Sequence, residues 1–214
     1  MGNTFVKVAF DLPKCKKEVN ELGRLLTSKA DLSEKRDILP FFRTRDQLCA
    51  FIGTFARDIG PASEIAREFS FLGDFAADLL VGNRDNKEYL AIEFEDGRKN
   101  SIFKNVRRSN ADWSQRFEHG YSQLIDWFAT LDDYKKTDKF RKEYGKGHIT
   151  FSGMLIVGRN SGVSDENRIR LDWRADKVLV DSHVINCITF DDLHQDLERR
   201  LQLYTAASRA KKRR

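Results

Sequence analysis

The stretch Phe71–Glu95, FLGDFAADLLVGNRDNKEYLAIEFE, contains two short apolar runs joined by a polar turn. The first run ends in Asp78–Val81, and the second is Tyr89–Ile92. The turn between them is rich in Gly, Asn and Asp, the residues that tight turns favour. The pattern predicts a β-hairpin.

Carboxylates border both runs of this hairpin. Asp74 and Asp78 accompany the first run, and Glu93 and Glu95 follow the second. An ionised carboxylate at the edge of an apolar core is costly unless a cation or hydrogen bonds satisfy it. Two readings are open: the acids on adjacent strands share one divalent cation, or they lie at strand ends and face water.

Composition indicates a protein that folds in water. The chain has 214 residues, of which 40% are hydrophobic and 33% charged. No apolar run approaches the ~20 residues of a membrane span, and the N-terminus lacks a secretory signal pattern. The three cysteines are far apart and form no CxxC pair or Cys/His cluster. We expect a reduced, cytoplasmic protein with no membrane partner.

Charge is concentrated at the C-terminus. The formal net charge is +5, and the segment Ser208–Arg214 alone holds five basic residues and no acid. The rest of the chain is therefore near neutral and is not a uniformly basic nucleic-acid binder. The tail either contacts phosphates or is a solvated, frayed terminus.

Apolar periodicity predicts the elements of the chain. Residues 16–29, 43–60 and 191–206 have helical spacing, and residues 31–41 form a short helix or turn that stops near Pro40. Residues 63–69 suggest one further short helix, so the first ~60 residues are predicted to be helical without a strand. The clearest helix spans 112–131, with Asp112 as its N-cap, and a charged hinge follows it. Residues 149–157 read as a buried strand, 169–173 as a short helix or strand, and 178–190 as one or two short strands.

The segment Gly97–Ala111 is basic and follows the hairpin directly. Lys99, Lys104, Arg107 and Arg108 crowd it. It is either suited to contacting phosphates beside a metal site or an ordinary charged loop. The predicted order is helices, hairpin, helix, strand, strand and helix, and a helix between strands of a mixed sheet indicates an α/β domain.

This order of elements resembles the PD-(D/E)XK nuclease superfamily, the restriction-endonuclease-like fold. Asp78 stands where that superfamily has its Pro-Asp element, and Glu93-Phe94-Glu95 stands where it has acid-x-Lys. Gln123 and Trp127 on the best helix are similar to its Gln-x-x-x-Tyr motif.

The amino-acid sequences of several segments most resemble the C-terminal nuclease domain of the Shedu-type antiphage defence proteins. The segments are GDFAADLLVGN, EYLAIEFEDG, SIF and FEHGYSQLIDWF, within about residues 60–200. The resemblance implies a restriction-endonuclease-like core with a mixed sheet over residues 61–207. A helical segment over 1–60 precedes this core, and the basic tail 208–214 follows it.

The resemblance also implies a site and a substrate. Asp78, Glu93 and the main-chain carbonyl of Phe94 would hold Mg²⁺ or Mn²⁺, and Glu95 and Gln123 would complete the catalytic set. The basic residues Lys99, Lys104, Arg107 and Arg108 would bind DNA, the expected partner. His119, four residues before Gln123, is a candidate base, although a lone His on such a helix is more often structural. Asp74, Glu64 and Glu68 are candidates for supporting roles.

One departure from the superfamily concerns Glu95, which replaces its lysine. Either a nearby cation such as Arg98, Lys99 or Lys104 takes that role, or Glu95 acts as a further ligand or base, or catalysis is lost. Three functions follow: a metal-dependent nuclease, an inactive nucleic-acid-binding or sensor domain, and a scaffold whose N-terminal helices pair two copies. The sequence leaves a homo-oligomer open.

Overall fold

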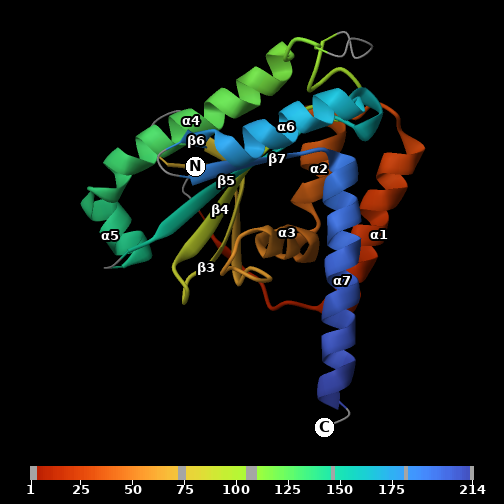
Figure 1. The fold of residues 1–214 in the computed structure, drawn as a ribbon. Coiled ribbons are helices and arrows are strands. Elements are labelled where there is room, and N and C mark those ends of the chain that lie inside the picture. Colours follow the sequence, from red (N-terminus) through yellow and green to blue (C-terminus); the bar gives the residue numbers. More distant parts are fainter. Residues whose placement is uncertain (1–3, 72–75, 105–109, 146–147, 181–182, 213–214) are drawn as a thin grey trace.

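A mixed seven-stranded sheet forms the centre of the fold, with helices on both of its faces (Figure 1). The structure is a computed structural model and describes residues 4–71, 76–104, 110–145, 148–180 and 183–212. The expected α/β class is confirmed. Within these ranges, no helix is both long and apolar enough to cross a membrane.

The strands follow the order β1-β2-β3-β4-β5-β7-β6 across the sheet. Neighbours from β1 to β4 are antiparallel, β5 and β7 run parallel to β4, and β6 returns antiparallel at the edge. Their bounds are β1 Val6–Lys7, β2 Glu64–Ser70, β3 Ala76–Asn83, β4 Glu88–Phe94, β5 Thr150–Ile156, β6 Leu179–Val180 and β7 His183–Ile188.

Helices precede and follow these strands. The α-helices are α1 Leu12–Ser28, α2 Leu39–Arg43, α3 Asp46–Ile52, α4 Gln115–Lys135, α5 Asp138–Tyr144, α6 Asp165–Lys177 and α7 Phe190–Lys212. Short helical turns of other types are a π-helix at Glu34–Ile38 and 3-10 helices at Gly53–Phe55 and Asn160–Gly162.

Two apolar cores lie on opposite faces of the sheet because side chains alternate along each strand. Leu90, Ile92 and Phe94 of β4 pack with α1, α2, α3 and α7. Tyr89 and Ala91 of the same strand pack with α4, α5 and α6. The next position with the parity of Tyr89 and Ala91 is 93, so Glu93 shares the α4 side of the sheet.

The predicted hairpin is confirmed as β3 and β4. The register pairs Leu79 with Ile92 and Val81 with Leu90. Asn83 receives hydrogen bonds from the main chain of Asp85 and Asn86 in the turn. The pattern succeeded here because strand alternation and turn chemistry are both local. The predicted strand at 149–157 and the final helix are also confirmed, as β5 and α7.

The short helix predicted over residues 63–69 is wrong, because this segment is β2. Its Glu, Ala and Arg residues favour a helix locally. The segment forms a strand instead because it pairs with β3, from Glu64 opposite Gly82 to Ser70 opposite Ala76. This pairing buries Ile65 and Phe69 fully. Tertiary pairing overrides local propensity in such a strand. β1 is a second strand in the region predicted to be helical.

Other boundaries also differ from the predictions. Pro40 lies in the first turn of α2 instead of ending a helix, a position where its missing N–H costs nothing. The charged hinge after α4 contains α5. The N-cap of α4 is Ser114 and not Asp112, because the Ser114 side chain accepts from the Phe117 N–H at 3.0 Å.

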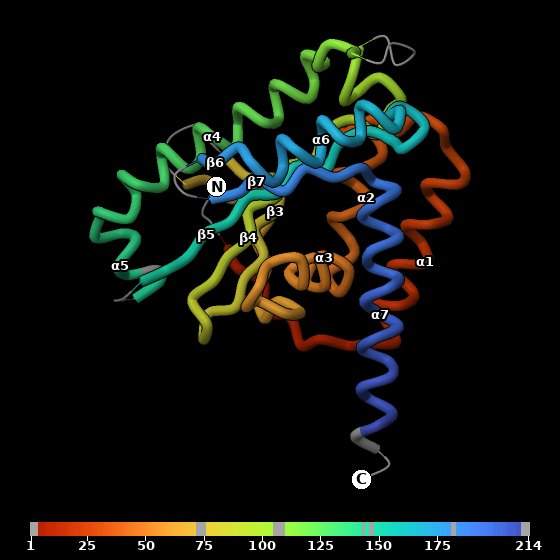
Figure 2. The backbone as a smooth tube through the Cα atoms, viewed as in Figure 1, coloured from red at the N-terminus to blue at the C-terminus, as the bar shows by residue number. Residues whose placement is uncertain are grey.

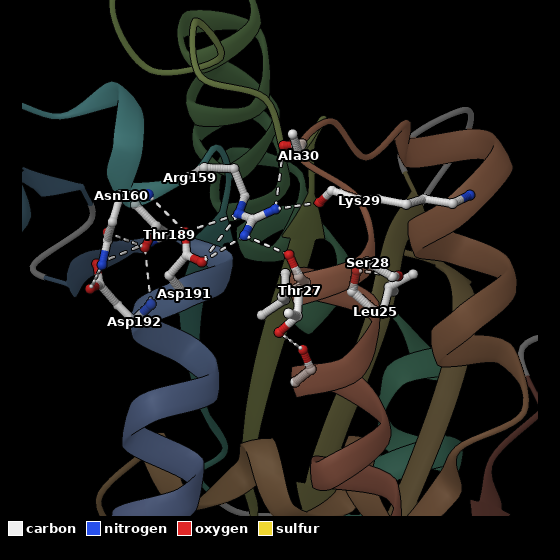
Figure 3. A network of polar contacts seen from close by, with 12 residues as sticks. Leu25, Thr27, Ser28, Lys29, Ala30, Arg159, Asn160, Thr189, Asp191 and Asp192 are labelled. Carbon is white, nitrogen blue, oxygen red and sulfur yellow. Dashed lines mark hydrogen bonds and ion pairs between the residues drawn. The ribbon is translucent and has the colours of Figure 1, made fainter.

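α1 and α7, from opposite ends of the chain, lie side by side (Figure 2). Arg159 joins them (Figure 3). Its guanidinium donates to the carbonyl of Leu26 at 2.9 Å and that of Lys29 at 2.8 Å, at the C-terminal end of α1. It also donates to Asp191 in the first turn of α7 at 2.9 Å. One partly buried arginine thus satisfies carbonyls that a helix end leaves without partners.

The basic segment that begins at residue 208 is largely part of α7. The helix continues to Lys212, and it extends beyond the rest of the fold (Figures 1 and 2). Residues 213 and 214 lie outside the described ranges.

Candidate active site

β3 and β4 bring Asp78 and Glu93 to one point of the sheet. The register of β3 with β4 ends at the pair Leu79–Ile92, and Asp78 and Glu93 are the next residues of the two strands. The Phe94 N–H donates to Asp78 Oδ2 at 2.9 Å. Each of the two carboxyls also shifts the pKa of the other, so their side chains lie close together.

The electrostatics of this pair favour protonation. Burial raises the pKa of the Asp78 carboxyl to about 7, and the charges of Glu34 and Glu95 act in the same direction. Burial raises the pKa of Glu93 well above its ordinary value, and the charge of Asp78 adds to this. Two buried carboxyls in contact cannot both ionise without a counter-charge.

One oxygen of this pair is left without a partner. Glu93 is 6% exposed, and its Oε2 is buried with no hydrogen-bond partner among the described residues. The Oε1 of Gln123, on the face of α4 toward the sheet, is in the same situation. A buried acceptor without a donor is costly and calls for an explanation such as an ion or water.

Glu95 lies deeper than expected and faces α4. It is 1% exposed. Its Oε2 lies 3.1 Å from Arg116 Nη1, and its Oε1 lies 2.9 Å from His119 Nδ1. Gly120 makes room for it, because a Cβ there would lie 2.9 Å from Glu95 Cγ. His119, taken from the sequence as structural, contacts the site.

Two further carboxylates join the site, Glu34 from the N-terminal segment and Asp96 directly after Glu95. The Glu34 N–H donates to Asp96 Oδ1 at 2.8 Å. Arg116 lies 3.5 Å from both side chains. Burial raises the pKa of Glu34, with the charge of Glu95 as the next cause. No local pattern could have linked Glu34 to acids so far along the chain. Arg116 and His119, by contrast, share a helix face with Gln123 and could have been found by that spacing.

A groove of about 500 Å³ opens beside Asp96, whereas Asp78 and Glu93 do not line it. Its lining includes Arg98, Lys104, Arg116, His119 and Asp96. Basic side chains outnumber the acid, so the groove suits an anionic ligand. It adjoins the first turn of α4, whose N–H groups add partial positive charge.

The other predicted residues are placed differently. Lys99 is exposed and lies outside the groove lining. Asp74, Arg107 and Arg108 lie outside the described residues. Glu64 accepts from the Tyr89 hydroxyl at 2.7 Å, and Glu68 pairs with Arg43 at 2.8 Å. Glu64 and Glu68 were predicted to lie on a helix, and both lie on the strand β2.

The Asp78–Glu93 pair offers two carboxylates as possible ligands of a cation. In the part of the chain that the structure describes, no three His, Cys, Asp or Glu side chains are arranged to hold a metal ion. Mg²⁺ commonly binds through one or two carboxylates and keeps several waters. The unpartnered Glu93 oxygen and the raised pKa of Asp78 therefore fit a hydrated divalent cation better than a fully protein-coordinated one.

Residues 31–194 match the family described as Shedu protein SduA, C-terminal. The match starts earlier than the resemblance seen in the sequence, and it includes the segment that carries Glu34. A search of curated proteins gives no significant match. The match covers well over half of the 214 residues, so the chain belongs to the Shedu family.

Proposed function

We propose that this protein is a metal-dependent nuclease that hydrolyses phosphodiester bonds of DNA. Membership of the Shedu family implies antiphage defence as its setting. The observation that carries the proposal is the Asp78–Glu93 pair, in which two buried carboxyls meet and one oxygen has no partner. A divalent cation would offset the repulsion and satisfy that oxygen.

The order of elements supports the proposal. A helix, three antiparallel strands, two helices and a strand parallel to the third follow one another as α3, β2–β4, α4 with α5, and β5. Apart from the short α5, this is the order expected for a restriction-endonuclease-like core. Asp78 and Glu93 lie on the second and third of these strands, where such a core would have its two acids.

Asp78, Glu93 and the main-chain carbonyl of Phe94 would hold Mg²⁺ or Mn²⁺. Such a cation lowers the pKa of a bound water and offsets negative charge on phosphate. Both oxygens of Glu95 already contact α4, so the direct cation contacts fall to the other two acids. Lys104 in the groove neutralises phosphate, and the amide of Gln123 contacts phosphate or water.

A DNA-binding domain without catalysis is the second candidate, because Glu95 stands where the superfamily has lysine. Its oxygens are engaged by Arg116 and His119 instead of facing the groove. Melting temperature separates the two candidates. A protein that binds Mg²⁺ in its folded state is stabilised by it through mass action, whereas an inactive domain without the cation site melts at the same temperature with or without Mg²⁺.

The activity test uses supercoiled and linear DNA with Mg²⁺ or Mn²⁺. We expect Asp78→Ala and Glu93→Ala each to lower the cleavage rate about 100-fold or more, as loss of an electrostatic catalytic group does. Asp126→Ala, an exposed position of α4, is the matched control and should cleave at the wild-type rate. If wild type cleaves and either site variant cleaves equally fast, the assignment of the site is wrong.

A further inference from the structure

One guanidinium at the start of α4 meets three carboxylates from two segments of the chain. Arg116 Nη1 lies 3.1 Å from Glu95 Oε2 and 3.5 Å from Glu34 Oε2. Arg116 Nη2 lies 3.5 Å from Asp96 Oδ2. Burial lowers the pKa of Arg116, but the charges of Glu95 and Asp96 raise it more. The arginine therefore keeps its charge inside an acidic cluster.

Glu95 requires a counter-charge at this depth. A carboxylate that is 1% exposed is strongly destabilising unless a cation and hydrogen bonds compensate it. Arg116 supplies the cation, and His119 contacts the second oxygen. The glutamate at the lysine position is thus paired with an arginine on the neighbouring helix.

Arg116 also reaches the groove. Its side chain is 45% exposed, and it lines the groove with Arg98 and Lys104. A guanidinium has five N–H donors in a planar fork. The carboxylates fix one side of the fork, and the remaining donors can face a phosphate in the bidentate geometry that arginine favours.

We propose that Arg116 is the phosphate-binding cation of this site and replaces the strand lysine of the superfamily motif. Glu95 is then a positioning residue that holds the guanidinium between the strand and the groove. The inference rests on the proposed function for the identity of the ligand as DNA. From the sequence, Arg98, Lys99 or Lys104 was expected to supply this cation, and the inference assigns it to Arg116 instead.

The first test measures DNA binding without cleavage. All variants carry Asp78→Asn, and duplex affinity is measured over a range of KCl concentrations. Arg116→Gln keeps amide donors toward Glu95 but removes the charge. We expect it to weaken binding about tenfold and to lower the slope of log affinity against log salt by about 1. Arg116→Lys should keep the slope.

Arg141→Ala is the matched control for this measurement. Arg141 lies on α5 and is 58% exposed, in an i,i+3 pair with Asp138. Its removal should leave the slope unchanged. Melting temperature and circular dichroism establish that each variant is folded. An unchanged slope in folded Arg116→Gln overturns the inference.

The second test exchanges the two charges in a chain with intact Asp78. Arg116→Gln alone should cleave about 100-fold more slowly than wild type. Glu95→Lys alone places a second cation beside Arg116 and should be impaired. The double variant, Glu95→Lys with Arg116→Gln, restores one cation at the motif position and should recover to within about tenfold of wild type. A double variant no faster than Arg116→Gln counts against the inference.

The two tests separate this inference from the proposed function. If the protein binds DNA with a salt slope that depends on Arg116, but wild type does not cleave DNA with either Mg²⁺ or Mn²⁺, the nuclease proposal fails and the assignment of Arg116 stands. If wild type cleaves and Arg116→Gln keeps both slope and rate, the nuclease proposal stands and the assignment of Arg116 fails.

Discussion

Asp78 and Glu93 are held together in a state that disfavours their ionised forms. Burial is the main cause for both. Burying two ionisable carboxyls on adjacent strands destabilises the fold, whereas apolar side chains of the same size would pack there without this loss of free energy. Perturbed carboxyls of this kind concentrate at functional sites, which is why the pair carries the functional argument.

The pKa of Asp78 makes stability depend on pH. It is about 7 in the folded protein against an ordinary value of 3.8. Between these values the folded protein binds more protons than the unfolded chain, so stability falls as pH rises. We expect the melting temperature of metal-free wild type to fall between pH 4 and pH 7.

Asp78→Asn should remove the part of the decrease in melting temperature with pH that the Asp78 carboxyl causes, because an amide stays neutral over this pH range. At pH 8 without metal it should melt above wild type. It should also lose the Mg²⁺-dependent rise in melting temperature. Asp126→Asn is the control and should follow the wild-type profile. A variant at position 78 that keeps both the pH dependence and the Mg²⁺ response would contradict the assignment.

At the scale of elements, the start of α4 sets which side chains reach the site. Ser114 is the N-cap, and its hydroxyl donates to the carbonyl of Ser101. Its N–H donates to the carbonyl of Ile102 at 2.9 Å. These bonds tie the helix to the loop after β4. They fix the position of Arg116 and His119 along the helix axis.

Ser114→Ala should destabilise the protein by about 1–2 kcal/mol, because a buried cap and a second hydrogen bond are lost together. Asp112→Ala is the matched control, since Asp112 is exposed and its carbonyl, which the substitution keeps, accepts from the Lys104 N–H. We expect a change within about 0.5 kcal/mol for it. Urea denaturation measures both, and a larger loss for Asp112→Ala would restore the N-cap predicted from the sequence.

At the scale of the whole molecule, Arg159 connects the two ends of the chain. Its side chain is 13% exposed, and it contacts α1 and the first turn of α7 (Figure 3). Asn160 and Asp192 extend the network at 2.9 Å. The segment 26–30 is thereby fixed next to the segment that carries Glu34.

Arg159→Ala should cost about 2–3 kcal/mol of unfolding free energy, because it leaves carbonyls and Asp191 without their donor. Arg24→Ala on α1 is the control: its side chain is 73% exposed and lies 3.9 Å from Glu21, so a change within about 0.5 kcal/mol is expected. Equilibrium unfolding of the full chain gives both values. Equal losses would show that Arg159 does not link the two helices.

The sequence by itself determined the elements whose signals are local. The hairpin of β3 and β4, the buried strand β5 and the long helices α4 and α7 follow from periodicity and turn chemistry over a few residues. It also placed Asp78 and Glu93 on adjacent strands, because a short hairpin leaves little freedom of register.

Only the tertiary structure decided which distant residues meet. It made residues 64–70 a strand through pairing with β3, and it brought Glu34 from the N-terminal segment and Arg116 from α4 to the carboxylates. Neither the strand at 64–70 nor the approach of Glu34 has a local signal, because strand pairing and charge compensation act through space between segments that the chain separates. The free energy of these contacts depends on the whole packed molecule, and a single stretch of sequence does not contain it.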